Sequence, residues 1–408
     1  MPNIPVGAQI FDLVFHPSES LVVTGLLTGD VKAFSYDEQG NHEERFSIRP
    51  SKRSCRGIAM NESGDKIWAV GKGKGVYTID TATGMVSDTR KGAHDVAINR
   101  VKRLLPNMFC TGDDDGVIKL WDPRQPEALR AYTHHYDFIS DFLWLEDKKH
   151  LVASSGDGTL SVLDVRSKKL EPFAQSEDQE DELLSLATIK GGQKVVVGTQ
   201  LGILSVFNRK SGWGDCVDRI PGHPHSIDAL CNVPSRYPNA QSTILTGSSD
   251  GLLRAVQLLP TKLLGVVADH GEFPIERIAV DQGGEGRWVG SVGHEEVLKL
   301  TDLKEVFEDD GDEEEEEEED ADEEGDEAKP EDNEEVKLEN SEGKGRKADA
   351  DSDEDEEEEE EEGDDSSDES VQESRKRKKK PEKDELQATR RKKGRNEIVT
   401  DPAFFADL

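Results

Sequence analysis

The sequence is poor in the features that build disulfide frameworks, membrane spans and aromatic cores. Only four of its 408 residues are cysteines, and Cys55, Cys110, Cys216 and Cys231 lie far apart and form no CxxC pair. That spacing argues against a structural zinc site and favours free thiols in a reducing compartment. No apolar run approaches the ~18 residues that span a bilayer, so we expect no membrane partner. Hydrophobic residues make up 33% of the chain, a fraction close to that of disordered proteins.

The excess of acidic residues, 88 Asp and Glu against 51 Lys and Arg, is unevenly distributed. Residues 1–307 carry a net charge of −8, residues 308–373 carry −35, and residues 374–408 carry +6. The first region has an ordinary globular composition and is long enough for a large domain. The second contains uninterrupted Glu runs at 313–319 and 356–362, and its self-repulsion predicts a disordered acidic tract. We therefore expect a folded head, an acidic tract and a basic tail.

A six-residue turn pattern recurs seven times in the head, and apolar runs flank each copy. The six positions are a small residue, Gly, two variable residues, a residue that is often Asp, and Gly. The second position of each copy falls at 25, 71, 112, 154, 198, 247 and 290. Gly and Asp supply the backbone conformations that tight turns need, so each copy predicts a hairpin. An apolar segment before each hairpin predicts a third strand, and a less regular fourth should follow. Four short strands every ~44 residues predict an all-β, seven-bladed β-propeller over residues 1–307.

Residues 92–122 resemble a complete WD40 repeat. They contain Gly92-Ala93-His94, then Thr111-Gly112, and end in Trp121-Asp122. In such repeats four side chains form a buried hydrogen-bond chain, which the resemblance places on His94, Thr111, Asp115 and Trp121. A catalytic triad is the alternative interpretation of the His, Asp and hydroxyl. Because no nucleophile elbow or dinucleotide fingerprint accompanies them, we expect a structural role and no enzyme. How the ring closes stays open at this point; residues 3–8 could add a strand to the seventh blade.

Two other patterns in the head have a chemical and a structural interpretation. Residues 71–75 alternate Gly and Lys but lack the spacing of a P-loop, so they favour a basic hairpin tip for an acidic or RNA partner. The histidine pairs His134–His135 and His223–His225 have no third ligand at a sensible spacing. That favours turn or hydrogen-bonded histidines over a metal site. We predict no cofactor, no metal and no small-molecule substrate.

Residues 121–124, Trp-Asp-Pro-Arg, match the WDxR pattern. In some WD40 proteins that resemblance implies docking to the adaptor of a cullin-4 ubiquitin ligase, here through Asp122 and Arg124. The alternative is that Asp122 ends a strand and Arg124 is an ordinary surface residue. Exposed aromatic residues are a second candidate for partner binding, and we expect Trp213 and Tyr237 to be exposed near blade junctions.

The tail carries three kinds of candidate signal. Acidic surroundings make four serines candidate sites for acidophilic kinases: Ser352, Ser366, Ser367 and Ser370. Two basic clusters predict a bipartite nuclear localisation signal, made of Arg375, Lys376, Arg377, Lys378, Lys379 and Lys380 and of Arg390, Arg391, Lys392, Lys393 and Arg395. The same clusters favour weak contact with RNA phosphates, and the alternative is a patch that balances the acidic tract. Near the end of the chain, Phe404, Phe405 and Leu408 predict a short linear motif for a partner or for the propeller.

As a set, the diverged propeller, the acidic tract, the double basic cluster and the FFADL end resemble the WD repeat-containing protein 55 family with its fungal counterparts. The opening Phe-Asp-Leu-Val-Phe-His-Pro of residues 11–17 adds to the likeness. The resemblance implies a nucleolar scaffold in ribosomal RNA production and large-subunit assembly, with pre-ribosomal or nucleolar protein partners. Two alternatives stay open: a substrate receptor of a cullin-4 ligase, and a chromatin propeller whose acidic tract binds histones or basic ribosomal proteins. For all three functions we expect the protein to lie in the nucleus, and for the scaffold role in the nucleolus.

Overall fold

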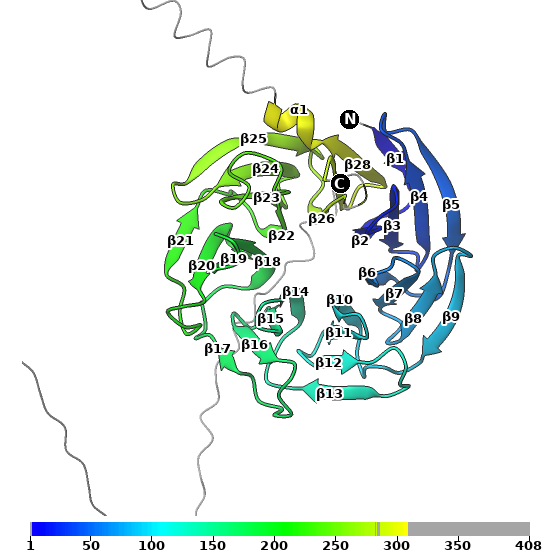
Figure 1. The fold of residues 1–408 in the computed structure, drawn as a ribbon, viewed down its shortest axis with the longest axis horizontal. Coiled ribbons are helices and arrows are strands. Elements are labelled where there is room, and N and C mark those ends of the chain that lie inside the picture. The colour runs from blue at the N-terminus through cyan, green and yellow to red at the C-terminus, as the bar shows by residue number, and fades with distance from the viewer. Residues whose placement is uncertain (1, 282, 284–285, 309–408) are drawn as a thin grey trace, which may run out of the picture. The chain divides into compact units, whose positions relative to one another are not determined.

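Seven four-stranded antiparallel sheets follow one another around a ring in the computed structural model (Figure 1). The structure describes residues 2–281, 283 and 286–308. Each sheet is one blade, and in blades 1 to 6 the strands run in chain order from the centre of the ring to its rim. The prediction of an all-β, seven-bladed propeller is therefore confirmed.

The first four blades take their strands from consecutive segments of the chain. Blade 1 consists of β2 (Ile10–Phe15), β3 (Leu21–Leu26), β4 (Val31–Tyr36) and β5 (His42–Ile48). Blade 2 consists of β6 (Cys55–Met60), β7 (Lys66–Gly71), β8 (Val76–Asp80) and β9 (Met85–Arg90). Blade 3 consists of β10 (Ile98–Leu105), β11 (Met108–Asp113), β12 (Ile118–Trp121) and β13 (Ala128–Tyr132). Blade 4 consists of β14 (Ile139–Leu145), β15 (His150–Ser155), β16 (Leu160–Asp164) and β17 (Ala174–Gln175).

The last three blades complete the ring. Blade 5 consists of β18 (Leu183–Ile189), β19 (Lys194–Thr199), β20 (Ile203–Asn208) and β21 (Asp218–Pro221). Blade 6 consists of β22 (Ile227–Asn232), β23 (Thr243–Ser248), β24 (Leu252–Gln257) and β25 (Lys262–Asp269). Blade 7 consists of β26 (Ile275–Val280), β27 (Trp288–Gly293), β28 (Val297–Asp302) and β1 (Asn3–Pro5). A short helix, α1 (Leu303–Glu308), follows, and no helix of the described residues is long and apolar enough to cross a membrane.

The ring closes by pairing the two ends of the folded region. Strand β1 lies antiparallel to β28, with Ile4 opposite Leu298, so the N-terminal segment supplies the outer strand of blade 7. Ile4 and Leu298 are both fully buried, and the amide of Leu300 donates to the carbonyl of Pro2 at 3.0 Å. Pairing first and last strands removes an exposed sheet edge and ties blade 7 to blade 1. Of residues 3–8, the segment for which a closing strand was left open, Asn3–Pro5 form β1.

The blades share one register, and a β-bulge marks the same place in each inner strand. In blade 3 the bulge lies between Ile98 and Arg100, and Arg100 then faces Gly112. By this pairing the equivalents of Gly112 are residues 25, 70, 154, 198, 247 and 292. The repeat pattern read from the sequence is therefore one residue out of register in blade 2 and two in blade 7. The pattern was placed on Gly71 and Gly290. The residues that pair after the bulge are Val70 in blade 2 and Val292 in blade 7.

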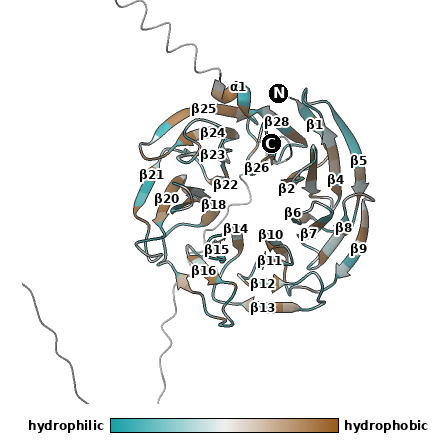
Figure 2. Cartoon of the chain, viewed as in Figure 1, coloured by the Kyte–Doolittle hydropathy of each residue, from teal (hydrophilic) through white to brown (hydrophobic). Residues whose placement is uncertain are grey.

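The hydrophobic core lies between neighbouring blades. Trp68 of blade 2 stacks on Phe109 of blade 3, with ring centroids 4.5 Å apart, and Phe109 in turn stacks on Trp121 at 6.2 Å. Outer strands such as β5, β9 and β21 are mostly exposed and more hydrophilic (Figure 2). Apolar burial thus holds the ring together from within, and the loops at its two faces are free to vary. We call the face at which the inner strands begin the entry face and the opposite one the exit face.

Candidate interaction surfaces

A buried chain of four side chains joins the loop before blade 3 to its second and third strands. The indole N–H of Trp121 donates to the Thr111 hydroxyl at 2.8 Å, and Thr111 lies 2.6 Å from Nε2 of His94. The Nδ1 atom of His94 lies 2.6 Å from a carboxylate oxygen of Asp113. With Nδ1 protonated, every donor in the chain has one acceptor. All four side chains are buried, so the chain satisfies polar groups that water cannot reach.

The acid of this chain is Asp113, and the prediction of Asp115 is wrong. Asp115 is exposed, and its backbone amide donates to Asp113 at 3.1 Å, as does the amide of Val117 at 2.8 Å. One carboxylate thus fixes the histidine and closes the hairpin turn. Three consecutive aspartates occupy positions 113–115, so composition and spacing could not select among them. The other three members, His94, Thr111 and Trp121, lie in the chain where the prediction places them.

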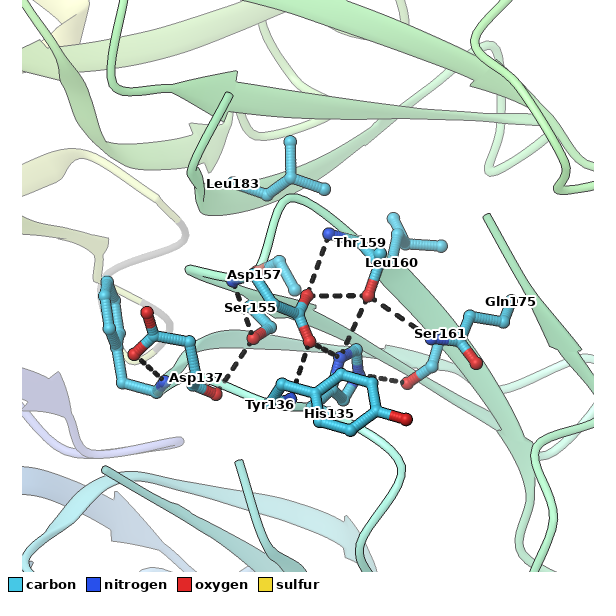
Figure 3. Close-up of polar contacts among 12 residues, drawn as sticks. His135, Tyr136, Asp137, Ser155, Asp157, Thr159, Leu160, Ser161, Gln175 and Leu183 are labelled. Atoms are coloured by element: carbon cyan, nitrogen blue, oxygen red, sulfur yellow. Dashed lines mark hydrogen bonds and ion pairs between the residues drawn. The ribbon is translucent and has the colours of Figure 1, made fainter. Parts of the chain in front are cut away.

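Blade 4 builds a related network from different positions (Figure 3). Nδ1 of His135 lies 3.0 Å from Asp157, and Nε2 lies 2.8 Å from the hydroxyl of Ser161. The residue in the place of Thr111 is Ala153, and Ser161 is its partner on the next strand. Burial raises the pKa of Asp157, but hydrogen bonds from His135 and Thr159 outweigh it and hold the pKa well below its usual range. Here the acid does stand at the position that Asp115 holds in blade 3.

Histidines recur at the entry face of two further blades. His223 lies 2.9 Å from the hydroxyl of Thr246, and His270 lies 2.7 Å from that of Ser291 and 3.0 Å from Glu295. These partners give the histidines a structural role. Within the described residues, no three His, Cys, Asp or Glu side chains are grouped to hold a metal ion.

The WDxR residues form a rigid ion pair at the exit face. Arg124 donates from Nε to one carboxylate oxygen of Asp122 at 2.9 Å and from Nη2 to the other at 2.7 Å. These hydrogen bonds lower the pKa of Asp122 to about 2. The Arg124 side chain is 69% exposed and that of Asp122 only 7%. The strand end thus anchors the acid, and the acid orients an accessible guanidinium.

A second arginine supports this loop from behind. Arg90, whose side chain is 10% exposed, donates to the carbonyl oxygens of Asp122 at 3.1 Å and Pro123 at 2.8 Å. Its guanidinium also lies over the rings of Phe109 and Trp121. A cavity of about 600 Å³ lies beside it, and Arg90 and Arg124 are among the residues that line it. A partner that binds Arg124 would therefore meet a preformed hollow.

The same geometry occurs once more on the neighbouring blade. Arg166 donates from Nε and Nη2 to the two carboxylate oxygens of Asp164, both at 3.0 Å, and its side chain is 62% exposed. Asp164 ends β16 of blade 4 as Asp122 follows β12 of blade 3. Sequence reasoning missed this pair because Leu163 replaces the Trp of the pattern. The signal that remains is the Asp-x-Arg spacing itself.

The central channel contains four charged side chains at equivalent positions just after the bulge. They are Asp12, Arg100, Asp141 and Arg277. Arg277 of blade 7 lies 2.8 Å from Asp141 of blade 4, across the channel, and 3.5 Å from Asp12 of blade 1. Burial opposes the charge on Arg277, but the two carboxylates outweigh it and raise its pKa. This cluster cannot be read from the sequence, because 136 residues separate Arg277 from Asp141.

Each carboxylate of the channel also joins two neighbouring blades. Asp12 accepts the backbone amide of Ile58 in blade 2 at 2.8 Å, and Asp141 accepts that of Leu186 in blade 5 at 3.1 Å. The remaining equivalent positions are small: Gly57, Ser185 and Ala229. The layer is charge-balanced, and its two carboxylates are buried, which favours a role in closing the ring over one in binding.

Other head predictions meet mixed outcomes. Residues 71–75 end β7 and form a turn that leads into β8, so the phosphate cradle of a P-loop does not form and the basic hairpin tip is confirmed. The prediction of exposed aromatic residues is wrong, since Trp213 is only 7% and Tyr237 only 4% exposed. Trp213 packs in the core of blades 4 and 5, and the Tyr237 ring lies 5.1 Å from that of Phe307 in α1.

The tail predictions lie outside the described residues. They concern the acidic tract, the serines between 352 and 370, the basic clusters between 375 and 395, and the aromatic end at 404–408.

Comparison with known proteins gives matches along the whole ring. A family model described as WDR55 matches residues 1–306. The WD repeat-containing protein JIP5 of Laccaria bicolor is 65% identical over 327 residues, which covers 77% of this chain and 78% of that protein. A WD repeat-containing protein 55 homolog of Dictyostelium discoideum is 37% identical over 300 residues (74% of this chain, 70% of that protein). WD repeat-containing protein 55 of Bos taurus is 34% identical over 305 residues (74% and 77%).

Proposed function

Because the chain belongs to the WDR55 family of WD repeat proteins, we propose that it is a non-catalytic nucleolar scaffold in ribosome biogenesis. The proposed role covers ribosomal RNA production and assembly of the large subunit. The observation that carries it is the closed, seven-bladed ring over the matched residues, whose buried polar groups are used to join strands and blades. A scaffold needs such a rigid frame, with variable loops available to partners on both faces.

The proposed nuclear localisation signal lies in the tail. The two basic clusters of residues 375–380 and 390–395 have the composition of a bipartite import signal. Neutralising Lys378–Lys380 together with Arg390–Lys393 should move a fluorescent fusion from the nucleus to the cytoplasm. An unchanged nuclear signal would reject the import role.

Affinity purification after nuclease treatment tests the scaffold role itself. Pre-ribosomal proteins retained without intact RNA would support direct protein contacts. Recovery of histones, with no pre-ribosomal proteins, would favour the chromatin alternative through the acidic tract. Recovery of cytoplasmic proteins alone would contradict both.

Docking to the adaptor of a cullin-4 ligase is a second candidate function, favoured by one observation. Arg124 and Arg166 are held in the same bidentate, exposed geometry on adjacent blades. Replacing both by Ala should abolish capture of the adaptor while the ring stays folded. Arg219→Ala is a matched control, since Arg219 is also half-exposed and ion-paired but lies on blade 5. Equal capture by all three proteins would exclude this surface.

A further inference from the structure

Four entry-face loops of blades 1 to 3 form one continuous surface. The connection of residues 49–54, from β5 to β6, contacts the turn of blade 1, because a Cβ atom on Gly29 would collide with the backbone oxygens of Ser51 and Arg53. It also contacts the turn of blade 2, whose Lys72 amide donates to the carbonyl of Ser54 at 3.0 Å. The turn of blade 2 also contacts the loop before blade 3, since Lys74 Nζ donates to the carbonyl of Asp95 at 2.5 Å.

This surface carries six exposed basic side chains, which we call the basic sector: Arg49, Lys52, Arg53, Lys72, Lys74 and Lys91. Apart from Lys74, none of them has an ion pair or a side-chain hydrogen bond to another described residue. Residues 27–30, 49–54, 72–75 and 91–95 contain two acids, Asp30 and Asp95. The head has a net negative charge, but the surface around the basic sector is positively charged.

The opposite part of the same face is acidic. The connection from β17 to β18 contains five acids within residues 177–182 and no basic residue. Glu177, Asp178, Glu180 and Glu182 are exposed. A long anion that approaches the entry face would be attracted to blades 1 to 3 and repelled from blades 4 and 5.

We propose that the basic sector binds the phosphate backbone of RNA. Protein partners derive most of their affinity from buried apolar or aromatic anchors, and among the large apolar residues exposed in the described chain only Leu27 lies on these loops. Binding to nucleic acid instead derives from arrays of Lys and Arg that release counterions, without any apolar anchor. This inference goes beyond the scaffold role and does not rest on it.

The experiment measures binding of a fluorescein-labelled oligouridine of about 20 nucleotides to the purified full-length chain by fluorescence anisotropy across a KCl series. The test variant combines Lys52→Ser, Arg53→Ser, Lys72→Ser and Lys91→Ser; Lys74 is kept because it holds a loop. Four lost phosphate contacts should weaken binding roughly tenfold to a hundredfold near 0.1 M salt. They should also reduce the slope of log K against log salt by about 2 to 3.

A matched control removes four lysines from the exit face: Lys148, Lys168, Lys169 and Lys210, all exposed. It retains the contribution of the basic tail and has the same net charge as the test variant, so it should bind much more tightly than that variant. Arginine in place of Lys52, Lys72 and Lys91 should preserve binding. Equal losses in test and control variants would overturn the proposal. So would tighter binding of labelled polyglutamate than of RNA at the basic sector, which would identify an acidic polypeptide as the ligand. Because purified protein is used, either result is independent of the partners recovered from cells.

Discussion

Blade 3 and blade 5 have the same backbone register but stabilise it with different chemistry. In blade 3, Trp121 and Thr111 belong to the polar chain that ends on Asp113. In blade 5, the equivalent positions hold Phe207 and Val197, which are fully buried in an apolar cluster. The polar chain is therefore not needed to form a blade.

The difference lies in how each blade would respond to change. An apolar site loses stability in proportion to the volume removed. A satisfied polar site loses stability when one member leaves its partner buried without a hydrogen bond. Four substitutions or conditions separate these two responses.

The largest effect is expected in the apolar blade. Phe207→Ala should lower the free energy of unfolding by about 3–5 kcal/mol, because it leaves a large cavity in a fully buried apolar cluster. Urea denaturation followed by tryptophan fluorescence would measure it. Phe173→Ala, at a side chain that is 63% exposed, should change stability little. A loss below about 1 kcal/mol at Phe207 would show that blade 5 is loosely packed.

Removal of the acid in blade 3 should have the next largest effect. Asp113→Ala leaves His94 and the backbone amides of Asp115 and Val117 without their acceptor, and should cost about 2–4 kcal/mol. Asp115→Ala is the matched control and should change stability by less than about 0.5 kcal/mol, since it is exposed. Equal losses at the two positions would contradict the assignment of Asp113.

Exchange of the central residue between the two blades should give a smaller change. Thr111→Val keeps the shape but removes the hydroxyl that joins Trp121 to His94, at a cost of about 1–2 kcal/mol. Val197→Thr introduces a hydroxyl into an apolar cluster and should cost a similar amount. Chemical denaturation of both variants would test this symmetry. If Val197→Thr had no effect, the cluster of blade 5 would already contain an acceptor.

The smallest effect is a dependence of stability on pH, which the entry-face histidines create. Blade 5 has no such histidine and should not contribute to it. Burial lowers the pKa of His134 and of His223 to about 4. The unfolded chain has the ordinary value of about 6.5, so it binds more protons, and stability should fall as the pH falls from about 6.5 to 4. At pH 5 each histidine should contribute about one proton to the uptake on unfolding. His134→Leu should reduce the slope of the free energy of unfolding against pH by the equivalent of one proton. An unchanged slope would contradict the lowered pKa of His134.

The sequence predicted the ring well and the site details unevenly. Seven hairpin patterns and the blade number followed from local turn residues and apolar runs, whereas the closure of the ring stayed open. The register failed at Val70 and Val292, where a neighbouring glycine imitates the turn position. The exposure of Trp213 and Tyr237 was wrong because packing against other strands and against α1 buries them. Local patterns contain no information about such neighbours.

The resemblance to a WD40 repeat supplied three members of the blade 3 chain. The sequence by itself determined the hairpin repeat and the division of charge. These depend on residues close together in the chain, where turn geometry and strand alternation act directly. Only the tertiary structure decided which of three aspartates accepts from His94, which charges close the channel, and which basic residues lie beside one another. Those features depend on distances between blades, and the distances are set when β1 pairs with β28 and closes the ring.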